Sequence, residues 1–190
     1  MSATATATAT RTAIPTGTWD VDPVHSKVGF AVKHMGVATV RGEFNEFEGR
    51  LEIGEDLATA RAYGTVQAAS VDTKQHQRDE HLRSADFFEV DQHPELRFES
   101  TAIEQVGEDT YRIVGELTMH GVTRELELEA ELGGTEIGPQ GEERIGLEIT
   151  GRLSRQEYGM RFNAALGSGN AVVSDRVRLA LDVAAVKRDA

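Results

Sequence analysis

The chain has 190 residues, enough for one domain with a sizeable core, and a formal net charge of −12 at pH 7. So acidic a surface disfavours nucleic acid and anionic membranes as partners, and the absence of cysteine excludes disulfides, thiol chemistry and zinc–thiolate sites. No window approaches the run of about 20 apolar residues that a membrane-spanning helix needs, so we expect no stable membrane insertion.

The start of the chain is rich in Ala and Thr and has little to bury. Residues 1–16 are therefore predicted to be a disordered tail, and residues 17–187 a single domain. This start also lacks the basic region and the apolar run of a secretory signal peptide. We therefore expect a cytoplasmic protein.

Eight segments alternate apolar and polar residues with the period of two that is typical of a strand with one dry face. They lie near residues 27–33, 44–53, 60–68, 96–99, 111–119, 125–132, 145–153 and 176–183. The pair His120-Gly121 suits a two-residue hairpin turn, and Gly133-Gly134 and Gly138-Pro139 together mark another reversal. The pattern predicts a mainly all-β fold, in which eight antiparallel strands can close into a barrel without exposed edges.

One face of the third segment carries unusually small residues. Ala60, Ala62, Gly64 and Ala68 leave volume that Leu or Phe would fill. A barrel of about eight strands is just wide enough for side chains or one small ligand. If this face points inward the barrel is hollow there, whereas opposite bulky Phe residues it belongs to an ordinary packed core.

A polar insert, around residues 73–90, interrupts the strand pattern. Polar residues from Lys74 to Arg83 are followed abruptly by Ala85, Phe87, Phe88 and Val90. We expect two helical turns here. Asp72 or Thr73 is predicted to cap a first helix that runs to about Arg83, and Ser84 to cap a second.

No catalytic or metal-binding constellation stands out. The six histidines lack a metal-binding pair at i, i+4 spacing with a nearby acid, so we expect no metal site; they are His25, His34, His76, His81, His93 and His120. No serine lies in a nucleophile elbow, no acid pair is selected, and the Gly167–Gly169 stretch does not follow a phosphate-loop pattern. The chain is therefore expected not to be an enzyme, and no cofactor is expected.

Binding is the more promising chemistry, because apolar side chains from separate segments could line one elongated cavity. These are Trp19, Phe30, Phe44, Phe87, Phe88, Phe98, Leu117, Met119 and Phe162, with Ala62 on the small-residue face. A charged rim could comprise Arg78, Asp79, His81 and Arg83. The alternatives are an ordinary apolar core and a salt-bridged cap that only orders the insert.

Several motifs, in order, resemble the YceI-like family. The opening matches over residues 17–30 (GTWDVDPVHSKVGF) and 32–35 (VKHM), and the central signature over 71–74 (VDTK), 78–88 (RDEHLRSADFF) and 94–98 (PELRF). The hairpin matches over 115–123 (GELTMHGVT), and the closing region over 155–163 and 174–177 (SDRV). The resemblance covers about residues 17–186.

The resemblance implies a lipocalin-like barrel that holds a long isoprenoid or related amphiphile, such as a polyprenyl phosphate or a quinone-type lipid. The family's members are often dimers, which implies a homodimer, and many carry a secretory leader. Three functions follow as hypotheses. The chain carries or sequesters such a lipid; it is an enzyme acting on a small amphiphile with His25, His81 or His120 as acid or base; or it is a stress-associated interaction module with a filled barrel.

Overall fold

The computed structural model describes residues 13–169 and 171–188. Eleven strands, three short 3₁₀ turns and one α-helix, α1 (His76–Arg83), are found in this part of the chain. The strands are β1 (Gly17–Val21), β2 (Lys27–His34), β3 (Ala38–Phe44), β4 (Phe47–Ile53), β5 (Arg61–Gln67), β6 (Val71–Asp72), β7 (Glu95–Gln105), β8 (Thr110–Met119), β9 (Val122–Ile137), β10 (Glu143–Ser154) and β11 (Val173–Lys187). The 3₁₀ turns are η1 (Leu57–Thr59), η2 (Ala68–Ser70) and η3 (Gln156–Tyr158).

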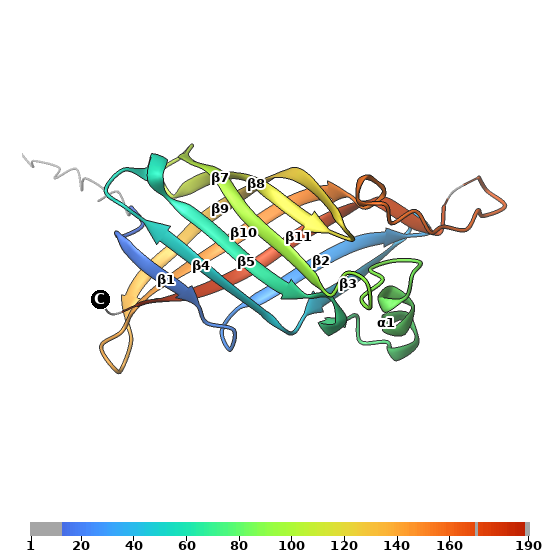
Figure 1. The fold of residues 1–190 in the computed structure, drawn as a ribbon, viewed down its shortest axis with the longest axis horizontal. Helices are drawn as coiled ribbons and strands as arrows, with labels where there is room; N and C mark the ends of the chain where they lie inside the picture. The colour runs from blue at the N-terminus through green and yellow to red at the C-terminus, as the bar shows by residue number, and fades with distance from the viewer. Residues whose placement is uncertain (1–12, 170, 189–190) are drawn as a thin grey trace, which may run out of the picture.

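Eight of these strands close into an antiparallel barrel, as the sequence pattern predicts. The ring runs β1-β4-β5-β7-β8-β9-β10-β11 and closes because β11 also pairs with β1. The strands β2, β3 and β6 extend the wall at one end: β11 pairs with β2, β2 with β3, and β3 with β6. The wall is therefore longer on that side (Figure 1).

The eight segments predicted from the sequence correspond to β2, β4, β5, β7, β8, β9, β10 and β11. The pattern misses β1, β3 and β6. β1 and β2 follow one another along the same partner, β11, and β3 and β4 likewise follow one another along β2 and β1. These long strands are interrupted by short turns, which break the period of two. A strand of two residues, such as β6, is too short to show any period.

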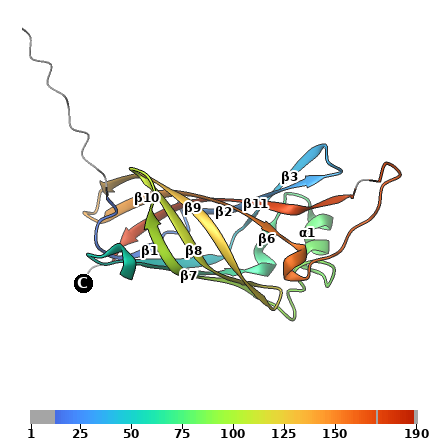
Figure 2. The same ribbon diagram turned by 90° about the horizontal axis from the view of Figure 1, so that it is seen from above.

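The two ends of the barrel differ. At one end, where β1 and the end of β11 lie, the interior is filled by fully buried side chains, including those of Trp19, Tyr111 and Ile145. At the other end lie α1 and the turn between β8 and β9 (Figures 1 and 2). There the chain between β6 and β7 carries α1 and contributes Phe87 to the core. The predicted helical insert therefore lies at one end of the barrel and packs against its core.

The register puts one apolar face of each strand inside. Directly opposite residues of an antiparallel pair share a face, and Leu128 lies opposite Ile113 while Phe98 lies opposite Leu117. The alternating glutamates of β9, such as Glu127 and Glu129, are exposed. This alternation puts the glutamates of β9 on the outer surface and its leucines in the apolar interior.

Two local predictions are wrong. The first helix is capped by Gln75, whose side chain accepts from the Arg78 amide, because Asp72 instead accepts from the amide of Lys74. No second helix follows in the described chain: Ser84 ends α1, its hydroxyl donating to the carbonyl of His81 at 2.7 Å, and turns follow.

The single reversal predicted from Gly133-Gly134 and Gly138-Pro139 does not begin at Gly133-Gly134. The strand β9 continues through both residues, and the pairing with β10 shifts register there. The reversal comes at Gly138-Pro139, as predicted. The His120-Gly121 hairpin also forms, with φ of 54° and 73° at the two residues, the positive values that a tight turn between twisted strands requires.

The N-terminal prediction can be followed only in part, because residues 1–12 lie outside the described residues. Ile14 packs against the core, and the carbonyl of Pro15 accepts a hydrogen bond of 3.1 Å from the indole of Trp19. Within the described residues, no helix is long and apolar enough to cross a membrane.

Candidate functional site

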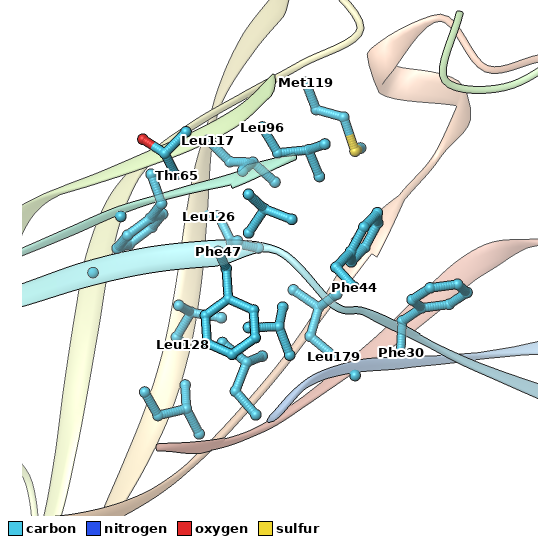
Figure 3. A pocket seen from close by; sticks show the side chains of 18 of the residues that line it. Phe30, Phe44, Phe47, Thr65, Leu96, Leu117, Met119, Leu126, Leu128 and Leu179 are labelled. Atoms are coloured by element: carbon cyan, nitrogen blue, oxygen red, sulfur yellow. The ribbon is translucent and has the colours of Figure 1, made fainter. Parts of the chain in front are cut away.

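An apolar cavity of about 310 Å³ lies inside the barrel. Its volume falls within the range of small-molecule sites, about 300–1,000 Å³. Strands from all around the ring contribute apolar side chains to its wall, for example Leu96, Leu126 and Leu179. Figure 3 shows Phe30 and Phe44 close together on one part of the wall, below Leu96 and Met119 in that view.

Small residues keep this space open. Ala62 and Gly64 line the cavity from β5, so the small-residue face predicted from sequence does point inward. The rings of Phe30 and Phe98 lie directly against Gly42 and Gly115, where a Cβ atom would collide with the ring. Because these two rings fold down onto glycine, they cover the wall instead of filling the lumen.

A chain of aromatic contacts joins the barrel wall to the insert. The ring of Phe44 lies 5.6 Å from that of Phe30 and 5.6 Å from that of Phe88, measured between centroids. The ring of Phe87 lies 5.3 Å from that of Phe162. Tilted and edge-on pairs of this kind are favourable geometries for aromatic packing. The insert is therefore held against the cavity by its aromatic residues.

A buried cation lies on the cavity wall. The side chain of Arg155 is only 3% exposed, and it donates to four backbone carbonyls, those of Met160, Phe162, Val173 and Ser174, over 2.7–3.1 Å. Burial lowers the pKa of Arg155, although a guanidinium stays protonated at neutral pH. The residue therefore places a positive charge beside an otherwise apolar space, and sequence reasoning did not single it out.

Two arginines of the predicted rim donate hydrogen bonds to the chain at the start of the insert and just before it. Arg78 donates through Nε and Nη2 to the hydroxyl and the carbonyl of Thr73, at 2.7 and 2.8 Å. Arg83 donates to the carbonyls of Ala69 and Val71, at 2.8 and 3.0 Å. These bonds tie the helix of the insert to the segment around β6. Asp79 is buried and accepts from the Thr73 amide at 2.9 Å.

His81 lies between the insert's surface and its aromatic cluster. Its Nε2 lies 2.8 Å from a carboxylate oxygen of Asp86, and its ring stands edge-on to Phe87 and Phe162. Together with Gln75, Gln77 and Arg78 it also borders a shallow surface depression. The predicted rim residues are thus at the α1 end, but outside the cavity wall.

Eight of the twelve predicted binding residues line the cavity. They are Phe30, Phe44, Ala62, Phe87, Phe88, Phe98, Leu117 and Met119. The other four, Arg78, His81, Arg83 and Phe162, lie in or against the insert. Trp19 fills the closed end instead of lining the cavity. Many aliphatic residues of the wall were not singled out, although the same inward alternation marks them.

The histidines proposed as acids or bases do not line the cavity. No described cavity-lining residue is a histidine. His25 is 64% exposed and pairs with Asp22 at 2.8 Å. That hydrogen bond, followed by the one from Arg144, lowers the pKa of Asp22 to about 2. His120 lies in the β8–β9 turn, where it approaches Glu89 and His93, a grouping that sequence reasoning missed.

A family model and curated relatives match most of the chain. The YceI-like domain model matches residues 19–185. A UPF0312 protein of Staphylococcus aureus (strain bovine RF122 / ET3-1) is 34% identical over 160 residues, covering 83% of this chain and 90% of that protein. A UPF0312 protein of Photorhabdus laumondii is 36% identical over 149 residues, covering 78% and 76%.

Solved structures share the fold. A YCEI protein of Campylobacter jejuni aligns with a TM-score of 0.70 at 27% identity, covering 83% of this chain and 90% of that one. BcnA of Burkholderia cenocepacia gives a TM-score of 0.74 at 20% identity, covering 86% and 98%. A polyisoprenoid-binding domain from Saccharophagus degradans gives 0.65 at 18%, covering 90% and 98%.

Proposed function

The chain belongs to the YceI-like family, and from this membership and the cavity we propose that it binds a long-chain isoprenoid or related amphiphile inside the barrel. The observation that carries the proposal is the apolar cavity of about 310 Å³, whose lining extends from the barrel strands to Phe87 and Phe88 of the insert. An apolar chain would gain about 0.8 kcal/mol for each CH₂ group removed from water.

The two different ends of the barrel favour one orientation of the ligand. The apolar tail would point towards the packed end, where Trp19 and Tyr111 leave no space. The polar end would lie at the α1 end, near the buried charge of Arg155 and the rim residues Arg78, His81 and Arg83. A cation in this position suits a phosphate or a quinone carbonyl, both of which accept hydrogen bonds.

The proposed ligand class is that of a structural neighbour with the same fold. The Saccharophagus degradans neighbour is a polyisoprenoid-binding domain, and it shares the fold over 90% of this chain. A polyprenyl phosphate or a quinone-type lipid would place branched apolar units along a wall built mainly of Leu, Val and Phe. Carriage or sequestration of such a lipid, in a cytoplasmic homodimer linked to stress, is the wider role that we propose.

Binding is favoured over turnover. Among the described residues of the cavity wall, no histidine stands beside an acid to transfer a proton. The apolar lining instead suits a function that needs only the burial of an apolar ligand.

For the proposed homodimer, light scattering of the purified chain would report a mass near twice 20.7 kDa.

The test is extraction of lipid from protein purified from its own host, followed by mass spectrometry. We expect a prenyl-chain lipid in stoichiometric amount. The delipidated chain should then take up a polyprenyl monophosphate or a long-chain ubiquinone in a saturable manner. If the native protein carries no lipid and the delipidated chain takes up neither probe, lipid binding is wrong and a ligand-free interaction module is the better reading.

A further inference from the structure

Three side chains with metal-ligating atoms meet outside the cavity, at the α1 end of the barrel. Glu89 and His93 lie in the segment between α1 and β7, and His120 lies in the β8–β9 hairpin, far away in sequence. One ligand atom from each lies within 4.8 Å of the others. The Nε2 of His120 is 3.4 Å from a carboxylate oxygen of Glu89, and the rings of His93 and His120 are 5.0 Å apart.

The backbone around these three residues holds their side chains close together. The amide of His93 donates to the carbonyl of Glu89 at 2.9 Å, so the turn brings these two side chains to one side. Gly121 has no side chain, and a Cβ there would lie 2.8 Å from the Cε1 atom of His93. The hairpin glycine therefore makes room for the imidazole against the turn.

Two of the three side chains sit on strained backbone. Glu89 and His120 have φ of 47° and 54°, and they are two of only four non-glycine residues with positive φ in the described chain. Such conformations cost free energy, and they persist where the surrounding structure demands them, often at functional positions. Here the strained residues are the ones that bring the carboxylate and the imidazole together.

The hydrogen bonding of His120 leaves a lone pair facing Glu89. Its Nδ1 lies 2.9 Å from the carbonyl oxygen of Tyr158. A carbonyl only accepts, so Nδ1 carries the proton, and in the neutral ring Nε2 is an acceptor. This Nε2 is buried without a hydrogen-bond partner and faces a carboxylate, which also only accepts when ionised. A cation between the two would satisfy both.

We propose that Glu89, His93 and His120 bind a divalent transition-metal ion of the zinc class. Two ligand atoms that are each about 2.0–2.1 Å from a tetrahedral zinc ion lie about 3.3–3.4 Å apart, the separation that His120 and Glu89 already have. The bond from Nδ1 of His120 to a backbone carbonyl is the outer-shell contact that orients metal-bound histidines. A small rotation of His93 completes the set, and water takes the fourth position.

The site would fasten the insert to the hairpin. Phe88 precedes Glu89 and Met119 precedes His120, and both of these neighbours line the cavity. A metal ion held by Glu89 and His120 would therefore fix two parts of the cavity wall relative to each other. This role differs from lipid binding and can be tested without any lipid.

The experiment uses the full-length chain without an affinity tag, stripped with a chelator and then titrated with Zn²⁺ against a chromophoric competitor. We expect one tight site per chain. Substitution Glu89→Gln or His93→Gln should weaken it by at least about 10- to 100-fold, since even outer-shell changes have that effect. Loading with Co²⁺ should give the visible absorption of a tetrahedral site, and circular dichroism should show that each variant is folded.

The matched control is His76→Gln. His76 is 84% exposed and pairs with Glu80 at i, i+4, so it offers a histidine beside an acid elsewhere on the surface. Its loss should leave the tight site unchanged. The proposal is overturned if the wild-type chain has no tight site, or if Glu89→Gln and His93→Gln bind Zn²⁺ as tightly as the control does. A protonated His120 paired with Glu89 would then be the better description.

Discussion

The phenyl rings of Phe44 and Phe88 meet edge to face, with centroids 5.6 Å apart and planes at 77°. Phe44 ends β3 and lies opposite Val71 of β6, whereas Phe88 belongs to the turn after α1. Both line the cavity. This contact therefore joins the extended wall of the barrel to the insert, at the α1 end.

Replacing Phe88 with Ala should loosen the insert. The change removes the edge-on contact and part of the cavity wall, so we expect a loss of about 1–3 kcal/mol in the free energy of unfolding. Hydrogen exchange should accelerate at residues 76–90 and change little in β8 and β9. Val37→Ala, at a side chain 81% exposed, is the control and should be neutral. Equal acceleration in all strands would show that the insert is not a separate unit.

Replacing Ala62 with Phe should fill the lumen. Because Ala62 faces the cavity, the ring can enter existing space, and we expect the free energy of unfolding to change by less than about 1 kcal/mol. Uptake of a prenyl lipid by the delipidated chain should be lost. Ala102→Phe adds the same volume at an exposed position of β7 and should leave uptake intact. Normal uptake by Ala62→Phe would place the lipid elsewhere.

Replacing Asp22 with Asn should destabilise the chain in a pH-dependent way. Asp22 accepts hydrogen bonds from His25 and Arg144, which lower its pKa from the ordinary 3.8 to about 2. A lowered pKa in the folded state stabilises the fold above pH 4, and this stabilisation disappears as pH falls towards 2. We expect a deficit of about 1–2 kcal/mol at pH 7, after allowance for solvent screening.

Urea unfolding from pH 7 down to pH 2.5 measures this deficit. The gap between wild type and Asp22→Asn should narrow below pH 4. Asp91→Asn, at an exposed position, is the control and should show no gap. A gap that stays constant over the whole range would mean that the charge of Asp22 does not contribute.

Replacing Arg155 with Met should destabilise the α1 end of the barrel. Four backbone carbonyls lose their donor, and we expect a cost of about 2–4 kcal/mol. Arg152→Met changes an exposed side chain of β10, three residues earlier, and it should change stability by less than about 0.5 kcal/mol. Similar costs for the two variants, measured by urea unfolding, would contradict a structural role for the buried guanidinium.

Local patterns were enough to predict the barrel but not its details. Alternation located β8 and β9 because these strands are long and regular, and a period of two is visible over ten or more residues. It marked one reversal by both Gly133-Gly134 and Gly138-Pro139, and the turn lies at the second pair because the pairing with β10 continues beyond the first. It failed at Ser84 because the residue that follows α1 could equally end one helix or begin another.

Some residues of the candidate sites could be predicted from local patterns, and others could not. The aromatic and small residues of the cavity follow from the inward alternation, so Phe98, Leu117 and Ala62 could be named in advance. Arg155 could not, because its sequence context reads as an ordinary charged residue after a strand. The grouping of Glu89 and His93 with His120 was also missed, although the i, i+4 spacing of the first two was a signal.

The sequence by itself determined the family, the number of strands in the barrel and the direction in which each strand's apolar face points, because these depend on local periodicity and on motifs in order. Only the tertiary structure decided that the barrel is packed at one end and hollow in the middle, that Arg155 is buried, and that His120 meets Glu89. Those features depend on which distant residues the strand register and the turns bring together, and no local pattern carries that information.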